Sequence, residues 1–268
     1  MRKILRPLFI IFILIFIYAP VLILAVYSFT DATQIGAFSG FSFENYITLF
    51  TTPELISMIL GTLILAISSS VIASVLGTAG AIGTFYSRRR TAFVVETLNQ
   101  VPVVNADVVT GFSICILLVI VLGVSKDTYI PLLVGHVTLC APFVYLSVMP
   151  KLKQLDPSLY EAALDLGATP STALRKVILP QLMPGIISGF ALAITLSLDD
   201  YFIATYTKPA TFDTISTYVV NATKGAQTNI KTALWALSTI IFAAVVLIVV
   251  IANLRSGAGK KDKARADI

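Results

Sequence analysis

The chain has 268 residues, of which 57% are hydrophobic and only 12% are charged, and its mean hydropathy is +0.90. Soluble globular proteins are about 45–50% apolar and about 25% charged, so this chain has too little charge to cover a soluble surface. Its apolar residues fall into long runs separated by short polar stretches, which is typical of several membrane-spanning helices. The composition therefore excludes a soluble enzyme, a disulfide-stapled secreted domain and a disordered chain.

Six apolar runs are long enough to cross a bilayer core, which takes roughly 20 helical residues. The first is too long for the apolar region of a signal peptide, and no small-residue cleavage site follows it, so we interpret it as a retained anchor. We predict an all-α membrane bundle with one transmembrane domain over residues 1–254 and a basic tail over 255–268. The predicted spans are about 7–29, 57–86, 99–124, 129–149, 183–206 and 232–254.

The basic residues predict the orientation of these spans. Fifteen of the 19 Lys and Arg residues lie at the N-terminus, in alternate loops and in the C-terminal tail, and the other four lie in the intervening loops. By the positive-inside rule, both termini are predicted to be cytoplasmic. The net charge of +5 therefore reflects the topology of the spans, and the basic residues of the tail suit the anionic lipids of the cytoplasmic leaflet. No nucleic-acid partner is expected. The outward segment 30–56 has no Lys or Arg, and we expect a short interfacial helix over 43–50.

Cysteine and histidine offer little chemistry in this chain. Cys115 and Cys140 lie in different predicted spans, where a free thiol behaves as a small buried hydrophobe. His136 precedes Cys140 by one helical turn, but no third ligand lies nearby, so we expect a hydrogen-bonded polar residue between helices. No metal and no cofactor is expected.

The predicted cytoplasmic loop over residues 150–182 is long and strongly patterned. Asp156 before a proline is typical of a helix N-cap, Thr169 before Pro170 repeats that start, and Gly167 can adopt the left-handed conformation that ends a helix. The loop therefore predicts two short helices, the second ending at Pro180. The first carries one apolar stripe, formed by Leu159, Ala162, Ala163 and Leu166.

The spacing in this loop resembles the EAA signature of the permeases of bacterial ABC importers. That signature is carried by Glu161-Ala162-Ala163, then Gly167, then Leu179-Pro180, and the one departure is Val177 where the family has isoleucine. The alternative is an amphipathic hairpin lying on the membrane. A membrane-lying helix favours bulky apolar residues, whereas this stripe is half alanine.

The resemblance implies fold, location and partners. It implies the six-span permease fold of type I ABC importers in the bacterial cytoplasmic membrane, a second homologous permease as heterodimer partner, two copies of a cytoplasmic ATPase and an extracytoplasmic binding protein. Glu161 would be a charged contact in a groove of the ATPase, the two alanines would permit close approach, and Gly167 would set the angle between the helices. The sequence has no phosphate-binding loop of its own, so the chain is not expected to be an enzyme.

Three acidic residues lie inside the predicted spans, where ionisable groups tend to face a transport pathway. Asp107 lies in the third span and Asp199-Asp200 in the fifth. At 1.5 Å per residue, straight helices would place Asp107 about 12 Å and Asp199 about 22 Å into their spans, as a ladder of acids at different depths. No Lys or Arg inside the spans neutralises them, so a cationic substrate is the simplest partner, and the ring of Tyr201 could support an alkylammonium group.

The segments 105–109 and 196–200 resemble those of spermidine/putrescine permease subunits, of the second kind in the heterodimer. This resemblance implies that Asp107, Asp199, Asp200 and Tyr201 lie along a polyamine route. Residues 206–209 depart from the Gly-Pro form that the family has there. Three alternatives stay open: structural roles for these residues, a permease for ferric iron or thiosulfate, and an ion-coupled secondary transporter, although we find no inverted repeat of the kind such transporters show.

Overall fold

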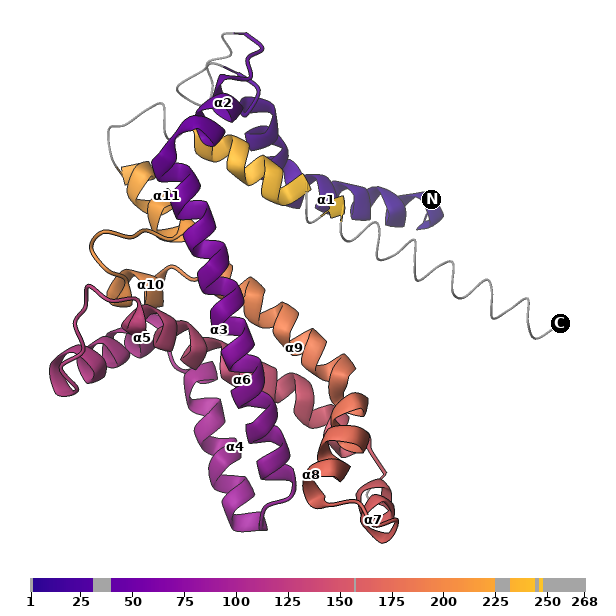
Figure 1. The fold of residues 1–268 in the computed structure, drawn as a ribbon. Coiled ribbons are helices and arrows are strands. Elements are labelled where there is room, and N and C mark those ends of the chain that lie inside the picture. The colour runs from indigo at the N-terminus through magenta and orange to yellow at the C-terminus, as the bar shows by residue number, and fades with distance from the viewer. Residues whose placement is uncertain (1, 31–39, 157, 225–231, 244–245, 248–268) are drawn as a thin grey trace. The chain divides into compact units, whose positions relative to one another are not determined.

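The computed structural model describes residues 2–30, 40–156, 158–224, 232–243 and 246–247. Within this part of the chain every regular element is helical, and one isolated antiparallel bridge joins Thr30 to Phe41. The chain divides into a central unit, Ser57–Tyr218, and a flanking unit, Met1–Ile56 with Val219–Ile268. Figure 1 shows the helices.

Four helical stretches in the described residues are long and apolar enough to cross a membrane. These are Phe9–Tyr27, Pro53–Phe85, Tyr129–Gln154 and Pro170–Asp199. A bent pair, Arg89–Val104 with Asp107–Val121, would form a fifth crossing. Of the sixth predicted span the described residues include a shorter apolar helix, Thr232–Ala243, while its end and the tail 255–268 lie outside the described residues. The protein is thus all-helical with four or five candidate spans.

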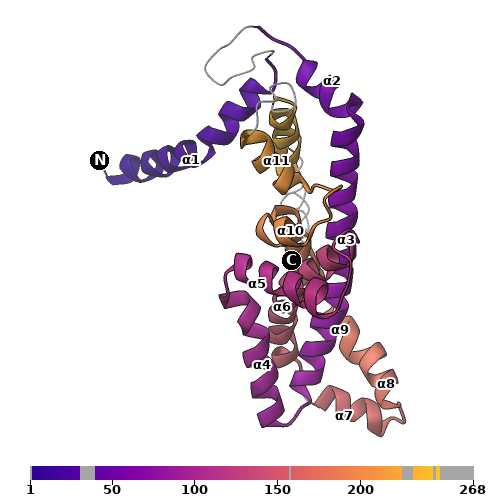
Figure 2. The ribbon, with the colours of Figure 1, turned by 90° about the vertical axis from the view of Figure 1, so that its left-hand side faces the viewer.

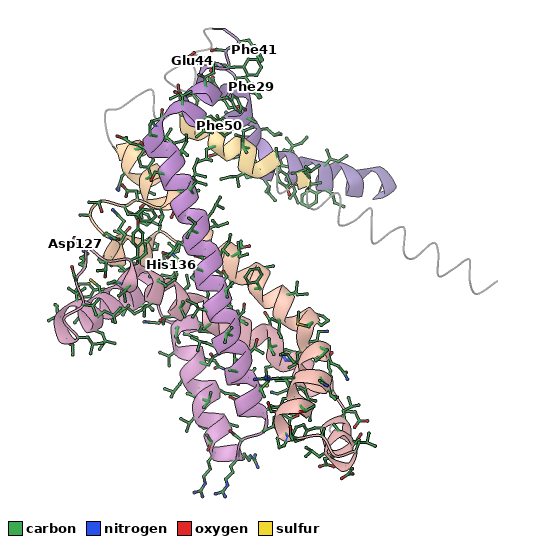
Figure 3. All side chains as sticks on the ribbon, viewed as in Figure 1. Phe29, Phe41, Glu44, Phe50, Asp127 and His136 are labelled. Atoms are coloured by element: carbon green, nitrogen blue, oxygen red, sulfur yellow. The ribbon has the colours of Figure 1, made fainter. Side chains whose placement is uncertain are left out.

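In the flanking unit, α1 (Arg2–Tyr27) is followed by the short helix α2 (Glu44–Thr51), which confirms the helix predicted over 43–50. The side-chain amide of Asn45 donates to the backbone carbonyls of Ser28 and Thr30 at 3.1 and 2.8 Å, which ties α2 to the end of α1. Aromatic rings gather around this junction, and two of them are labelled in Figure 3; the ring contacts join Phe29, Phe41, Phe43 and Tyr46. The place of α2 at the membrane interface stays a prediction.

The central unit is built around α6 (Ile130–Gln154), which packs most extensively against α9 (Leu179–Asp199). Cys140 and the residues four, eight and twelve positions later are fully buried, as one continuous face of the helix. Cys140 is a free thiol whose Sγ lies 3.3 Å from the carbonyl oxygen of Ala193 on α9, which agrees with its expected role as a small buried residue. Close approach of α6 and α9 needs a glycine, because a Cβ on Gly189 would lie 3.1 Å from the Cα of Val144.

Helices α4 (Arg89–Val104), α5 (Asp107–Cys115) and α10 (Phe202–Thr207) also contact α6. The helices α3 (Pro53–Phe85) and α4 are joined by a short turn, and this turn lies at the same end of the unit as α7 and α8 in both Figure 1 and Figure 2. The remaining elements are the π-helical segment η1 (Ile116–Val121), α7 (Ser158–Asp165), α8 (Pro170–Ala173), the π-helical segment η2 (Leu174–Ile178) and α11 (Ile215–Lys224).

The prediction of one continuous helix over 99–124 is wrong. Helix α4 begins at Arg89 and ends at Val104, and α5 starts at Asp107 in a direction that differs by 106°. Pro102 removes a backbone donor from the last turn of α4, and the side-chain amide of Asn105 donates to the Thr110 hydroxyl at 3.1 Å across the break.

The prediction of one helix over 183–206 is also wrong. Helix α9 ends at Asp199, the backbone is extended at Asp200, and the separate helix α10 follows. Both breaks coincide with Asn or Asp residues, whose side chains hydrogen-bond to nearby groups and so compete with the helix ladder.

Candidate functional site

The two helix breaks bring the three predicted acids to one cavity. Asp107 is the first residue of α5 and Asp199 is the last residue of α9. The cavity has a volume of about 270 Å³, and its lining residues are Asp107, Leu139, Thr195, Leu196, Asp199, Asp200, Tyr201 and Phe202. The expected ladder at different depths assumed two straight helices, and neither is straight. The structure places the acids together instead.

The neighbouring residues Asp199 and Asp200 have different surroundings. The side chain of Asp199 is exposed, whereas Asp200 is only 8% exposed. The Asp200 carboxylate accepts hydrogen bonds from the backbone N–H groups of Ile203 at 3.2 Å and Ala204 at 2.7 Å, so it caps the start of α10. Its backbone carbonyl also accepts a hydrogen bond from the Ser216 hydroxyl. Asp200 is therefore held by the protein, and Asp199 is free to meet a ligand.

His136 of α6, which is labelled in Figure 3, lies beside the buried carboxylate of Asp200. Its side chain is fully buried, its Nδ1 lies 2.9 Å from the Leu132 carbonyl oxygen, and its Nε2 lies 3.7 Å from Oδ2 of Asp200. The last distance is beyond ordinary hydrogen-bond range, so this contact is electrostatic. The prediction of a hydrogen-bonded polar residue between helices is confirmed in part: His136 is buried and hydrogen-bonded, but its hydrogen bond is to its own helix, and it meets Asp200, beyond the end of α9, without one.

Helix α10 holds its place in the central unit through two close approaches. Ile203 of α10 is fully buried between α5 and α6. A Cβ on Gly111 of α5 would lie 2.9 Å from the Cα of Ile203, and a Cβ on Gly135 of α6 would lie 2.6 Å from its Cγ2. Only glycine fits at these two contacts, and they hold α10 beside the cavity.

The cavity can hold a cation. Asp107 and Asp199 are both exposed, and neither makes a salt bridge within the described residues. The half-buried ring of Tyr201 lies at the rim, with its centroid 5.2 Å from that of Phe202. The residues that line the cavity, all within the described ranges, include no Lys or Arg. Free carboxylates beside aromatic faces suit an ammonium group.

The hairpin predicted from the patterned loop is present, and its capping residues act as predicted. Oδ1 of Asp156 accepts hydrogen bonds from the backbone N–H and the hydroxyl of Ser158 at 2.9 and 2.8 Å, and these bonds lower the pKa of Asp156 below its usual 3.8. Gly167 ends α7 with a φ of +86°, and Oγ1 of Thr169 accepts from the N–H of Thr172 at 3.3 Å. Residue 157 lies outside the described residues.

The four residues of the predicted apolar stripe do not share one degree of exposure. Glu161 and Ala162 are exposed, as a docking surface requires, but Ala163 is buried and Leu166 is 89% exposed. Helix α7 packs on η2, and Leu166 lies after the end of α7, in the turn at Gly167. Glu161 also lines a cavity of about 390 Å³ near the end of α3.

The second helix of the hairpin was predicted to end at Pro180, and this prediction is wrong. It runs from Pro170 through η2 into α9, so that Leu179 and Pro180 form the first turn of α9. The wider turns of the π-helical segment η2 relieve the clash that a proline ring makes inside a regular α-helix. The hairpin is thus continuous with a candidate membrane span.

The structure also contains a second cavity that sequence reasoning missed, with charged and amide side chains beside a largely apolar wall. It has a volume of about 480 Å³, lies between α4 and α6, and contains the ion pair of Glu96 and Lys153, whose Nζ and Oε1 are 3.7 Å apart. The predicted span began at residue 99 and left Glu96 in a loop. Two amide side chains, Asn99 and Gln100, follow Glu96 by about one turn, and this spacing was the available signal.

Comparison with known proteins decides the family. Residues 76–256 match the family described as "Binding-protein-dependent transport system inner membrane component". The chain belongs to this family. It is therefore a non-catalytic permease subunit of an ABC importer in the inner membrane, and an ATPase and a binding protein are its implied partners. The family resemblance drawn from the EAA spacing is confirmed.

Relatives of this ABC importer permease span nearly the whole chain. It is 33% identical over 260 residues to the putrescine transport system permease protein PotI of Escherichia coli K12, covering 93% of this chain and 90% of that one. It is 30% identical over 253 residues to the spermidine/putrescine transport system permease protein PotC of Haemophilus influenzae, with 94% and 96% covered. The E. coli K12 PotC is equally 30% identical, with 94% of each chain covered.

Solved structures show the same fold. A chain from the bacterial alginate ABC transporter in complex with alginate pentasaccharide-bound periplasmic protein has a TM-score of 0.71 at 20% identity, with 92% of this chain and 91% of that chain covered. A chain from an amino acid ABC transporter with histidines has a TM-score of 0.51 at 19% identity, with 76% and 95% covered. At these identities the likeness concerns the fold alone.

Proposed function

We propose that this permease imports polyamines, as one half of a heterodimer that works with two copies of an ATPase and an extracytoplasmic binding protein. The observation that carries the proposal is the cavity shared by Asp107 and Asp199, which combines free carboxylates with aromatic rings and has no basic lining residue. The names of the relatives, which span more than nine tenths of the chain, point to the same substrate class.

The cavity discriminates among the alternative substrates. An oxyanion such as thiosulfate would be repelled by the carboxylates at short range. A hydrated metal ion would gain little from Tyr201 and Phe202, whereas the methylene and ammonium groups of a polyamine can rest on ring faces. In this assignment Asp107, Asp199 and Tyr201 meet the substrate, and Asp200 positions α10 from within the protein.

We assign energy coupling to the hairpin. Glu161 and Ala162 offer the exposed contact for the ATPase, and Gly167 sets the angle between α7 and α8. Leu179 and Pro180 connect the hairpin to α9, whose far end carries Asp199. A rigid helix of this kind carries a displacement at the ATPase to the acid cavity.

The proposed topology has six spans in one transmembrane domain, 1–254, both termini in the cytoplasm, and 255–268 as a basic tail. The turn that precedes Arg89 and the α7–α8 hairpin lie at one end of the central unit in both views, which supports placing both on the cytoplasmic side (Figures 1 and 2). The acid cavity lies where α4 and α9 end, away from that side.

The test is uptake into proteoliposomes that contain the full transporter. We expect labelled putrescine or spermidine to enter in an ATP-dependent manner, and ferric iron and thiosulfate not to enter. The substitution Asp199→Asn should lower polyamine uptake about tenfold or more, the effect of losing one charged contact. The matched control Asp127→Asn, at an exposed loop residue outside the cavity, should not change it. Import of iron or thiosulfate, or unchanged uptake in Asp199→Asn, would overturn the proposal.

A further inference from the structure

Helix α4 directs three polar side chains toward α6. Glu96, Asn99 and Gln100 line the cavity between the two helices, together with residues of α6. Large exposed apolar side chains of α4 that line neither this cavity nor the next hollow are Phe93, Val94 and Leu98. Polar groups within a membrane helix avoid lipid and face protein or a water-filled path, so this arrangement marks the α6 side as the path.

The cavity between α4 and α6 offers both charge and apolar surface. Glu96 pairs with Lys153 at 3.7 Å, and both side chains are well exposed, so the pair is weak and open to exchange with another cation. The side-chain nitrogen of Asn99 is buried without a hydrogen-bond partner among the described residues, so the amide is not held by the protein. Leu146 and Met149 give the cavity an apolar wall.

Two hollows lie along α4 between its middle and the acid cavity. Gln100 lines both the cavity beside Lys153 and a neighbouring hollow, whose other lining residues are Thr97, Val101, Val104 and Asn105. Asn105 lies two residues before Asp107, which lines the acid cavity. Glu96 lies eight residues before the end of α4, a rise of about 12 Å along the helix. The row Asp107, Asn105, Gln100 and Glu96 therefore follows α4 from the acid cavity toward its cytoplasmic end.

We propose that this row is the exit route of the transported cation and that Glu96 is a second, cytoplasmic-side binding group for its ammonium end. The inference rests on the proposed function. Lys153 neutralises Glu96 when no substrate is present, and an arriving ammonium group displaces it, while the methylene chain lies on Leu146 and Met149. The carboxylate thus receives the cation that Asp107 and Asp199 release.

A purely structural role predicts something different. If Glu96 only ties α4 to α6 through Lys153, then removing either partner has the same effect. If Glu96 meets the substrate, removing Lys153 frees the carboxylate, whereas removing Glu96 deletes the binding group. The two single substitutions therefore separate the two roles.

The experiment measures polyamine uptake by the full transporter with Glu96→Gln, Glu96→Asp and Lys153→Gln. We expect Glu96→Gln to lower the maximal rate about three- to fivefold, the size of one exposed charge contact, with the half-saturating concentration unchanged because the binding protein sets it. Glu96→Asp should recover most of the rate, and Lys153→Gln, which frees the carboxylate for the substrate, should raise it. A wild-type rate in Glu96→Gln, or equal losses in Glu96→Gln and Lys153→Gln, would overturn the inference.

A labelling experiment tests whether the substrate reaches Gln100 without measuring the rate of uptake. In transporters with Cys115→Ser and Cys140→Ser, Gln100→Cys should react with a positively charged thiol reagent, and spermidine should protect it. The matched control Leu98→Cys, at an exposed residue that lines neither hollow, should show no protection. Absence of protection at Gln100→Cys in transporters that import spermidine would also overturn the inference.

The two proposals fail in different ways. A wild-type transporter that imports no polyamine contradicts the proposed function. A wild-type transporter that imports polyamine, loses uptake in Asp199→Asn and keeps it in Glu96→Gln contradicts only the exit-side role of Glu96.

Discussion

The coupling hairpin and the acid cavity are built in opposite ways. The hairpin, Ser158 to Ile178, is held by contacts between residues a few positions apart: Asp156 with Ser158, Thr169 with Thr172, and Gly167 at the bend. The cavity joins residues of α5, α6, α9, α10 and the segment between α9 and α10, which are up to about 95 positions apart in the sequence. The turns of the hairpin are set by these local contacts, although Ile178 is buried in the core of the central unit and Tyr160 packs against that core. The cavity, in contrast, exists only once the bundle is packed.

The same contrast holds between two neighbouring residues. Asp199 and Asp200 are chemically identical, yet one is exposed to the cavity and the other is buried as the cap of α10. The end of α9 between them rotates the second carboxylate into the protein. Residue type therefore does not distinguish a substrate contact from a structural one at this position.

The largest effect is expected at the hairpin. Reversing the charge in Glu161→Lys should lower ATP-dependent uptake and substrate-stimulated ATP hydrolysis about tenfold or more, because a charged interface contact becomes repulsive. The fold should be unaffected since the side chain is exposed. The control Asp165→Lys, on the same helix, should retain uptake. Equal losses in the two variants would show that general charge, rather than the position of Glu161, matters.

At the cavity, Asp200→Ala should lower the free energy of unfolding by about 2 kcal/mol, because it removes the acceptor of two buried N–H groups and the neighbour of His136. Asp199→Ala should leave stability unchanged. Thermal unfolding of the purified permease in detergent measures both. Equal stability of the two variants would remove the structural distinction between the two aspartates.

A smaller effect is expected at the bend of the hairpin. Gly167→Ala should destabilise the hairpin by about 1 kcal/mol, because an alanine at a φ of +86° is strained. Gly83→Ala, where the added methyl group meets open space within α3, should be neutral or stabilising. Protease sensitivity of the hairpin and thermal unfolding compare the two. If Gly167→Ala is as stable as Gly83→Ala, the left-handed bend is not required.

The smallest effect concerns pH. Because the folded protein lowers the pKa of Asp156, its stabilisation of the start of α7 is complete above the unfolded value near 3.8 and is lost as the pH falls through the lower folded value. Hydrogen exchange of residues 158–162, corrected for its intrinsic pH dependence, should therefore accelerate below about pH 4. Asp156→Asn should abolish this change. Acceleration that persists in the variant would assign it to another group.

Some features were predictable from the sequence because their causes are local. Apolar runs revealed a helical membrane protein, the capping residues and Gly167 placed the hairpin, and the spacing from Glu161 to Pro180 indicated the family. The continuation of the second hairpin helix through Pro180 was not predictable, because η2 accommodates the proline by a change in helix type that composition does not signal.

The amino-acid sequence alone thus determined the class of protein, the presence of the hairpin and the identity of the acids that line the cavity, since each depends on residues close together in the chain. Only the tertiary structure decided where α4 and α9 break, that Asp107 and Asp199 share one cavity, that Asp200 faces His136, and that Glu96 faces α6. These features depend on which helices pack together, and that packing is set by close contacts between distant residues, such as Gly111 and Gly135 with Ile203.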